Sequence, residues 1–294
     1  ASSKRCATTS RRQRRGRGMT ETLVTITLTR YAEPDDLVWE TLESLASQEA
    51  LSGEVVFLDQ NWSTEFSERV ESLATETLVF RCLPCARAGL SYARNEGLRG
   101  AANDIVLFID PDAVAAPRWA SRLASALLQE GVCIAGARII PRWLGQRPLL
   151  ARSRIVLDQY SLLDWGKETK PALRVVGAAF GVCRSRLPPG NAFDTTLGRR
   201  DGRLYSGEES ELCRRVIAAR GLVLYCGEAA VEHQILPERL NTIWVLRRLY
   251  YAGLSRAKTG GAPAPSSRLG FWDWLLLPAI LPAYVIGWVS ARIK

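Results

Sequence analysis

Residues 104–112 read DIVLFIDPD. The apolar run from Ile105 to Ile109 predicts a strand that is buried on both faces of a sheet. Two carboxylates, Asp110 and Asp112, follow directly where this strand ends. Mg²⁺ and Mn²⁺ bind such oxygen ligands, and one or two carboxylates are typical for a cation that also binds diphosphate oxygens. The alternative is a turn whose acidic residues only terminate the strand.

Strands and helices alternate on both sides of this segment. Predicted strands cover residues 22–29, 54–58, 77–82, 132–139, 174–183 and 222–225. Predicted helices cover residues 35–48, 65–74, 88–99, 119–129, 208–220 and 241–258. This alternation predicts an α/β fold with a Rossmann-like, mainly parallel sheet and helices on both faces. Such sheets bind ligands beyond the carboxyl ends of their strands, where we expect Thr29, Asp59 and Asp110.

The net charge of the chain is concentrated in its first residues. The 294 residues carry a formal charge of +9, and residues 1–18 contain seven basic residues and no acidic ones. Subtracting those seven from +9 leaves +2 for residues 19–294. We therefore expect a basic disordered tail over 1–18 and an ordered chain that starts near Met19. The composition, 47% hydrophobic and 23% charged, excludes a wholly disordered chain, a collagen and a coiled coil.

Cysteine and histidine give little support for other chemistries. The seven cysteines are scattered, which is typical of reduced thiols in a cytosolic protein. Cys82 and Cys85 have a C-x-x-C spacing, but no second pair supplies the other half of a zinc site. His233 is the sole histidine, so a hydrolase with a catalytic histidine would depend on this residue. A lone histidine is more often structural than a ligand.

The C-terminal residues are strongly apolar. After a Gly/Pro/Ser linker at 259–267, residues 271–290 read FWDWLLLPAILPAYVIGWVS. The uninterrupted apolar part, 274–289, has 16 residues. As a helix it would be roughly 24 Å long, shorter than a hydrocarbon core of ~30 Å. Two prolines and the terminal tryptophans favour contact with the membrane interface over a core helix, and a true span is the weakest alternative. The predicted location is cytoplasmic and peripheral, at the inner face of the cytoplasmic membrane.

Two arginines are suited to anionic ligands. Residues 89–97 read GLSYARNEG and place Arg94 on a predicted helix just ahead of the central strand. Its planar guanidinium suits a phosphate or a base, although an ordinary surface helix is the alternative. Arg248 belongs to another predicted helix, where it serves either an anionic site or helix packing.

Two neighbouring glutamates open a predicted helix. Residues 206–212 read SGEESEL and place Glu208 and Glu209 in its first turn. A carboxylate at this position is suited to general base catalysis. Ser206 and Glu209 also have the spacing of a capping box, and acidic residues in a first turn suit the helix dipole. The spacing alone leaves a catalytic and a structural interpretation open.

Together, these segments resemble the inverting family 2 glycosyltransferases, which have the GT-A fold. In chain order, the similar elements are V-x-D-x-x-S at 56–63, G-x-x-x-A-R-N-x-G at 89–97, D-x-D at 110–112, G-x-x-F at 177–180, F-D at 193–194, G-E-D-x-E-L-x-x-R at 207–215 and V-x-H at 231–233. The resemblance covers residues 20–258, and these motifs in one order are more specific than any of them alone. It implies a GT-A domain over 19–258, followed over 259–294 by a linker and an apolar, membrane-associated segment. The Q-x-x-R-W motif of processive synthases is missing from the sequence, so we expect one sugar per encounter.

The resemblance also implies a reaction, in which an acceptor hydroxyl displaces a nucleoside diphosphate from the anomeric carbon of a nucleotide sugar. The implied ligands of a Mn²⁺ or Mg²⁺ ion are Asp112, Asp110 and His233. The implied contacts to the nucleotide sugar are Thr29, Asp59, Arg94, Asp110 and Arg248, and those on the acceptor side are Gly177 and Phe180. The implied base is Glu209, where the family usually has aspartate, and the longer side chain leaves Glu208 as the alternative. The expected donor is a UDP- or GDP-sugar, and the expected acceptor is a glycan, a lipid or a small molecule.

Three other functions stand as alternatives. A sugar-nucleotide nucleotidyltransferase has a similar fold but needs a Gly-rich basic loop after its first strand, and residues 29–34 (TRYAEP) contain no glycine. A nucleic-acid-binding protein would rely on the tail over 1–18 and would lose salt-sensitive binding without it. We expect no specific nucleic-acid partner. A catalytically inactive GT-A scaffold would not turn over a sugar nucleotide.

Overall fold

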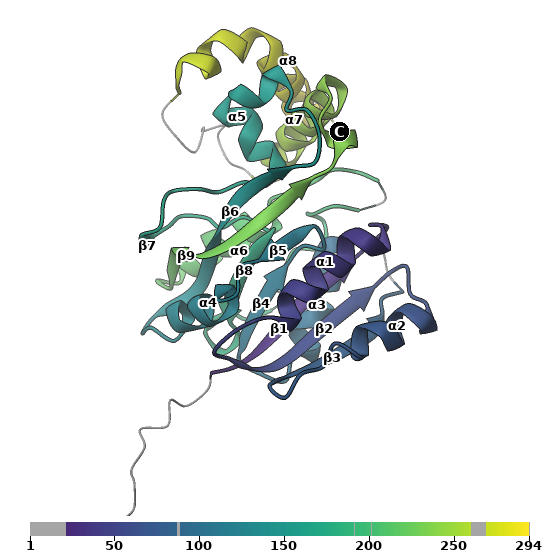
Figure 1. Ribbon diagram of the computed structural model, residues 1–294. Coiled ribbons are helices and arrows are strands. Elements are labelled where there is room, and N and C mark those ends of the chain that lie inside the picture. The colour runs from purple at the N-terminus through teal and green to yellow at the C-terminus, as the bar shows by residue number, and fades with distance from the viewer. Residues whose placement is uncertain (1–21, 87–88, 191, 201, 260–268, 294) are drawn as a thin grey trace, which may run out of the picture.

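The computed structural model describes residues 22–86, 89–190, 192–200, 202–259 and 269–293 (Figure 1). The predicted tail over 1–18 and most of the predicted linker lie outside these residues. The strands are β1 (Leu23–Arg30), β2 (Ser52–Asp59), β3 (Leu78–Pro84), β4 (Ile105–Ile109), β5 (Ala113–Ala115), β6 (Val132–Trp143), β7 (Thr169–Pro171), β8 (Ala179–Cys183) and β9 (Leu222–Ile235). The α-helices are α1 (Asp35–Ala46), α2 (Thr64–Glu71), α3 (Leu90–Gly100), α4 (Trp119–Leu127), α5 (Arg154–Leu157), α6 (Glu208–Ala218), α7 (Thr242–Lys258) and α8 (Phe271–Ile293).

One sheet organises the described residues. Its order is β3-β2-β1-β4-β8-β6-β9-β5, and β7 pairs with β9 outside this path. The strands β3, β2, β1 and β4 are parallel neighbours, whereas β8 is antiparallel to β4 and β6. Helices α1, α2 and α4 cover one face, and α3 and α6 cover the other. The predicted sheet with helices on both faces is therefore confirmed.

β9 is much longer than its sequence pattern indicates. The predicted strand over 222–225 extends to Ile235, and β9 pairs with β6 over 222–226 and again over 230–235. Exposed residues interrupt the apolar run, and the register shifts between Ala137 and Arg138 of β6. Because pairing with β6 rather than local hydrophobicity holds this strand, the sequence pattern reveals only its first part. The extension carries His233 into the sheet.

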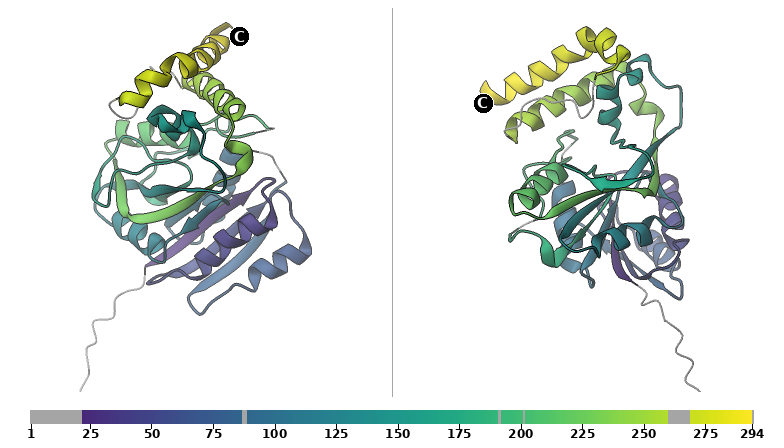
Figure 2. Two further views of the ribbon diagram at one scale, coloured as in Figure 1. Left: turned by 45° about the horizontal axis from the view of Figure 1, so that its top comes forward. Right: turned by 90° about the vertical axis from the view of Figure 1, so that its left-hand side faces the viewer.

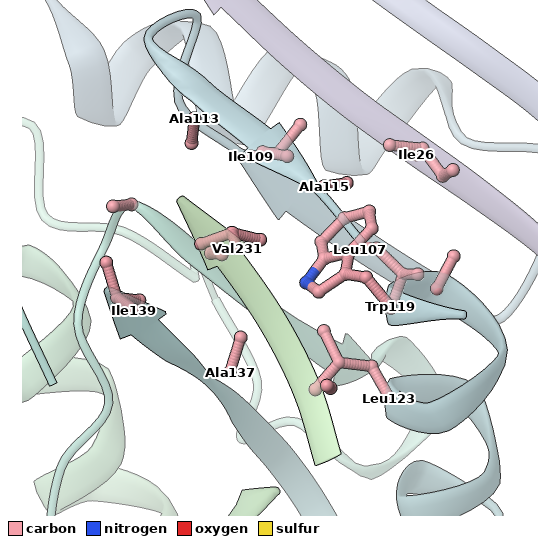
Figure 3. Packing of buried hydrophobic residues seen from close by; sticks show 14 of the residues in the cluster. Ile26, Leu107, Ile109, Ala113, Ala115, Trp119, Leu123, Ala137, Ile139 and Val231 are labelled. Carbon is pink, nitrogen blue, oxygen red and sulfur yellow. The ribbon is translucent and has the colours of Figure 1, made fainter. Parts of the chain in front are cut away.

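A hydrophobic cluster fixes the strands that lead to this end of the sheet (Figure 3). Trp119, at the start of α4, is fully buried and belongs to the same cluster as Leu107 of β4, Ala113 of β5 and Val231 of β9. Buried aromatic side chains contribute the largest single areas to such cores. The shared packing therefore holds the ends of β4, β5 and β9 in one arrangement.

Helices α7 and α8 pack against each other at one end of the domain (Figure 2). Their backbones come close together at two glycines. A Cβ at Gly253 would lie 2.1 Å from the carbonyl oxygen of Tyr284, and one at Gly287 would lie 2.0 Å from that of Tyr250. α8 is a 23-residue helix, longer than the 16-residue apolar part that the sequence suggested. The apolar segment is thus packed on the domain by one of its faces.

Candidate active site

The D-x-D and V-x-H segments meet through a strand pair that the sequence patterns did not predict. After β4, the short strand β5 runs antiparallel to β9, so that Ala113 lies opposite His233. This register brings ligand atoms of Asp110, Asp112 and His233 to within 4.8 Å of one another. Carboxylate oxygens and an imidazole nitrogen are suitable ligands for Mn²⁺, and the three groups are close enough to share one cation.

The hydrogen bonds of His233 support a positive charge at this place. Its Nδ1 lies 2.8 Å from the carbonyl oxygen of Tyr160, and its Nε2 lies 3.1 Å from Oδ1 of Asp112. Because a carbonyl oxygen only accepts, Nδ1 must carry the hydrogen. A neutral ring would then direct the lone pair of Nε2 at a carboxylate. A proton or a metal cation between Nε2 and Asp112 removes this repulsion, so the residues fit a cation site.

Asp112 is also bound by an arginine that the sequence analysis missed. Nη1 of Arg239 donates to Oδ2 of Asp112 at 2.8 Å. Burial by itself raises the pKa of the Asp112 carboxyl, but His233 and Arg239 outweigh burial and hold that pKa well below its usual range. Arg239 lies in a short turn after β9 and belongs to no recognisable motif. Its surroundings therefore favour the charged form of Asp112.

Arg94 connects the two groups of acidic residues. Its guanidinium is 3% exposed and donates to Oε1 of Glu208 at 2.8 Å, to Oδ1 of Asp110 at 2.9 Å and to the carbonyl oxygen of Gly177 at 2.8 Å. A Cβ at Gly177 would lie 3.0 Å from Nη2 of Arg94, so glycine permits this approach. The contact of Arg94 with the nucleotide stays a prediction, and in the structure the guanidinium bonds to protein atoms.

The two glutamates open α6, but not as a capping box. Gly207 is the N-cap residue, with a φ of 99°, and no side-chain cap bond forms there. Oγ of Ser206 instead lies 3.4 Å from Nη1 of Arg248. Burial and the charge of Glu208 raise the pKa of the Glu209 carboxyl to about 8. A carboxyl with a pKa close to the working pH is suited to accept a proton.

A cavity opens beside the cation site, at the carboxyl ends of β1 and β4. Its lining residues are Thr29, Arg30, Tyr31, Glu33, Gln60, Gly89, Leu90, Asp110, Pro111, Asp112, Arg199, Arg200, Gly202, Arg203 and Leu204. Thr29 and Asp110 therefore lie at the edge of the sheet where the sequence predicted them. Three of these lining residues, Arg199, Arg200 and Arg203, add basic groups to the wall. No sequence pattern singled them out, because each lies in an irregular segment between motifs.

Asp59 ends β2 but is enclosed by protein groups. Nε of Arg30 donates to its Oδ1 at 2.8 Å, Nη2 of Arg30 bonds to Oδ2, and the backbone nitrogen of Asn61 donates to Oδ1 at 2.8 Å. Arg30 also lines the cavity and pairs with Asp35. The contact of Asp59 with a nucleobase stays a prediction, and Arg30 is the group that this carboxylate holds at the cavity.

Two further predicted contacts lie elsewhere than expected. Phe180 is fully buried and stacks on Phe108 with ring centroids 4.9 Å apart. The prediction that Phe180 lines the acceptor side is therefore corrected, because it packs within the core. Arg248 is buried too, and its Nη1 donates to the carbonyl oxygen of Leu204 at 2.8 Å. Burial and the neighbouring Arg199 lower the pKa of Arg248 to about 10. Arg248 thus contacts the cavity wall through Leu204, which lines the cavity.

The sheet and its helices have the GT-A fold, which is the fold of similar glycosyltransferases. Among solved structures, the mannosyltransferase PcManGT from Pyrobaculum calidifontis, in complex with GDP-Man and Mn²⁺, is similar with a TM-score of 0.58 and 18% identity, over 92% of this chain and 75% of that chain. GalNAc-T7 with UDP, GalNAc and Mn²⁺ gives a TM-score of 0.57 and 14% identity, over 83% of this chain and 52% of that chain. At these identities, the likeness shows the fold.

The sequence profile of glycosyl transferase family 2 matches residues 24–184, and the chain belongs to this family. It is 24% identical over 221 residues to a glucosyl-dolichyl phosphate glucuronosyltransferase of Haloferax volcanii, which covers 74% of this chain and 70% of that protein. It is 28% identical over 200 residues to a pre-mycofactocin glycosyltransferase of Mycobacterium tuberculosis, over 64% of this chain. The match spans only 40% of the mycobacterial protein.

Proposed function

We propose that this glycosyltransferase moves one sugar from a nucleotide sugar to an acceptor hydroxyl, with inversion and with a bound Mn²⁺ or Mg²⁺ ion. The observation that carries the proposal is the convergence of Asp110, Asp112 and His233 within 4.8 Å at the edge of the cavity. The similar structures hold GDP-Man with Mn²⁺ and UDP with Mn²⁺, which supports a nucleotide-sugar donor and a divalent cation.

The donor side combines acidic and basic groups. Asp110, Asp112 and His233 would hold the cation, which supplies positive charge to a diphosphate leaving group when bound. Arg199 lies near enough for its charge to act on both aspartates, and it faces the same cavity. As the bond to the diphosphate oxygen breaks, negative charge grows on that oxygen, and a preorganised guanidinium stabilises it. Thr29 and Arg30 would line the nucleotide part of the cavity.

The acceptor side depends on Glu209 as the general base. The acceptor oxygen forms the new bond to the anomeric carbon, its proton passes to Glu209, and the electron pair of the broken bond leaves with the diphosphate. One displacement of this kind inverts the anomeric carbon. Glu208 beside it keeps the proton affinity of Glu209 high. Arg94 bonds to both Glu208 and Asp110. This link would hold the base, which is next to Glu208, at a fixed distance from the donor site.

For the acceptor, we propose a lipid-linked hydroxyl at the inner face of the cytoplasmic membrane. α8 has a mean hydropathy of 1.7, and only 11% of its apolar window is buried. By length and composition it is the one described helix that is suitable for crossing a membrane. The Haloferax relative is named for a dolichyl phosphate substrate, which supports a lipid carrier here.

The proposal is tested by a thermal-shift panel of UDP-, GDP-, CMP- and dTDP-sugars, each with Mn²⁺ and with a chelator. A donor at 100 times its Kd should raise the free energy of unfolding by about 2.7 kcal/mol. We expect one nucleotide class to stabilise the protein, and only with Mn²⁺. Stabilisation by none of the four, or an equal effect with the chelator, would overturn the proposal. Release of the nucleoside diphosphate on adding acceptor then separates an active enzyme from an inactive scaffold.

A further inference from the structure

α8 carries an apolar stripe that the rest of the protein leaves exposed. Its exposed large apolar side chains are Phe271, Trp274, Leu275, Leu281, Val285, Ile286, Val289 and Ile293. They recur every three to four residues, so they lie along one face of the helix. Proline residues at 278 and 282 continue the same face and are exposed too. Contiguous apolar surface of this extent marks an interaction site on a soluble domain.

This stripe is fixed in place, because the opposite face and the first turn of α8 are bound to the protein. The opposite face packs on α7 at Gly253 and Gly287. In the first turn, buried Asp273 accepts hydrogen bonds from Oγ of Ser153 at 2.8 Å, from the backbone nitrogen of Arg154 at 2.7 Å and from that of Gly270 at 2.8 Å. The stripe is therefore a preformed surface of the domain.

The packing of α7 against α8 is incompatible with a simple span. α7 packs along α8 and ends in Arg256, Ala257 and Lys258. Arg256 lies near enough to Tyr284, in the second half of α8, for its charge to act on the phenol. If α8 crossed a bilayer in this arrangement, Arg256 would enter the hydrocarbon with it, at a considerable cost. A helix that lies in the plane of the interface keeps α7 and its charges on the water side.

Basic groups border the apolar stripe at both ends. Near its start, Arg147 and Arg152 line a shallow cavity together with the exposed Leu149. The guanidinium of Arg152 lies 4.6 Å from the ring of Trp272. Near its end, the guanidinium of Arg292 lies 3.7 Å from the ring of Trp288. Tryptophan and arginine at the two ends of an apolar face match the headgroup layer of a bilayer, where anionic lipids attract basic side chains.

We propose that the α8 stripe and the segment 146–152 form a docking face for a bilayer that contains anionic phospholipid. α8 lies in the plane of the interface, and Arg147 and Arg152 contact lipid phosphates. The proposal specifies how the membrane location of the proposed function is achieved. It does not depend on the sugar-transfer reaction, because binding to vesicles needs neither donor nor acceptor.

The apolar part is tested by sedimentation of the full chain with vesicles of phosphatidylcholine and phosphatidylglycerol. The double variant Trp274→Ser, Ile286→Ser removes two exposed side chains of the stripe and should lower the partition coefficient at least ~10-fold. Leu173→Ser is the matched control, because Leu173 is as exposed but follows β7, away from α8. Equal binding of the double variant and the parent would overturn the proposal.

The electrostatic part is tested by comparing anionic vesicles with vesicles of phosphatidylcholine alone. Arg147→Gln with Arg152→Gln should weaken binding to the anionic vesicles several-fold, and high salt should remove this difference because the Debye length falls to ~3 Å at 1 M. Arg118→Gln, at an exposed arginine paired with Glu49, should leave binding unchanged.

Light scattering tests whether a second copy of the chain, rather than a bilayer, covers the stripe. A stable dimer that Trp274→Ser, Ile286→Ser dissociates would show that a second copy covers the stripe, and would overturn membrane docking.

Discussion

Asp112 and Glu209 lie on the two sides of one site, and their surroundings act on them in opposite directions. At Asp112, burial raises the pKa, but His233 and Arg239 outweigh burial and hold that pKa well below the usual range. At Glu209, burial and the charge of Glu208 act in the same direction and raise the pKa to about 8. A carboxylate that stays charged is suited to a cation, and a carboxyl that takes up a proton is suited to base catalysis. The environment therefore supports the two proposed roles.

The largest effect is expected where the charged carboxylate is removed. Asp112→Asn should lower kcat/KM by roughly 1000-fold, because the site loses both a ligand and the partner of His233. Donor binding should no longer depend on Mn²⁺. Asp104→Asn is the matched control, since Asp104 lies just before β4 at its opposite end and bonds to Ser185. Unchanged Mn²⁺ dependence of donor affinity in Asp112→Asn would refute the role.

The second effect concerns the base. Glu209→Gln preserves size and much of the hydrogen bonding, and should lower kcat by ~100-fold or more while the protein stays folded. Glu208→Gln should lower kcat less. Glu211→Gln in the same turn of α6 controls for helix effects, because Glu211 pairs with Arg215 on the same helix. A fully active Glu209→Gln enzyme would transfer the role to Glu208 or to another residue.

Substitution of Arg94, which links the two sides of the site, should have a smaller but measurable effect. Arg94→Lys keeps the charge but loses the planar fork, so one side chain no longer bonds Glu208, Asp110 and Gly177 together. We expect kcat to fall roughly 10-fold to 100-fold, since small displacements of reacting groups are costly. KM for the donor should change little. Arg99→Lys, exposed on the same helix, is the control. A large rise in donor KM with normal kcat would instead support Arg94 as a donor contact.

The smallest effect is a shift in pH dependence. Only the deprotonated form of Glu209 can accept a proton, so kcat/KM should rise with pH as the pH passes the raised pKa of this carboxyl. Glu208→Gln removes a neighbouring negative charge and should move the rising limb to lower pH by about one unit. An unmoved limb would mean that the titrating group is not Glu209.

Much of the fold was predictable from the sequence, because its first half is encoded locally. β1, β2 and β4 are apolar runs that end in polar residues, and the helices between them have clear periodicity. Strand β5 has only three residues, and β7 likewise, so neither leaves a pattern. The long β9 is held by its neighbour β6, which no local pattern shows.

Residues of the candidate site could be predicted only where they belong to motifs of a known family. Asp112 and His233 are 121 positions apart, and their pairing followed from family resemblance rather than from spacing. Arg239 was missed, because a single arginine in a turn carries no signal until the fold brings it to Asp112. Phe180 was misplaced, because an apolar residue in a motif suits a binding wall and a core equally well.

The most direct test of opposite roles is a titration of the donor by calorimetry with Mn²⁺, on Asp112→Asn and Glu209→Gln side by side. If Asp112 holds the cation and Glu209 acts only on the acceptor, Glu209→Gln should keep the donor Kd within about twofold of the parent, whereas Asp112→Asn should lose measurable binding. Equal loss of donor affinity in both variants would contradict the division of the site into a cation side and a base side.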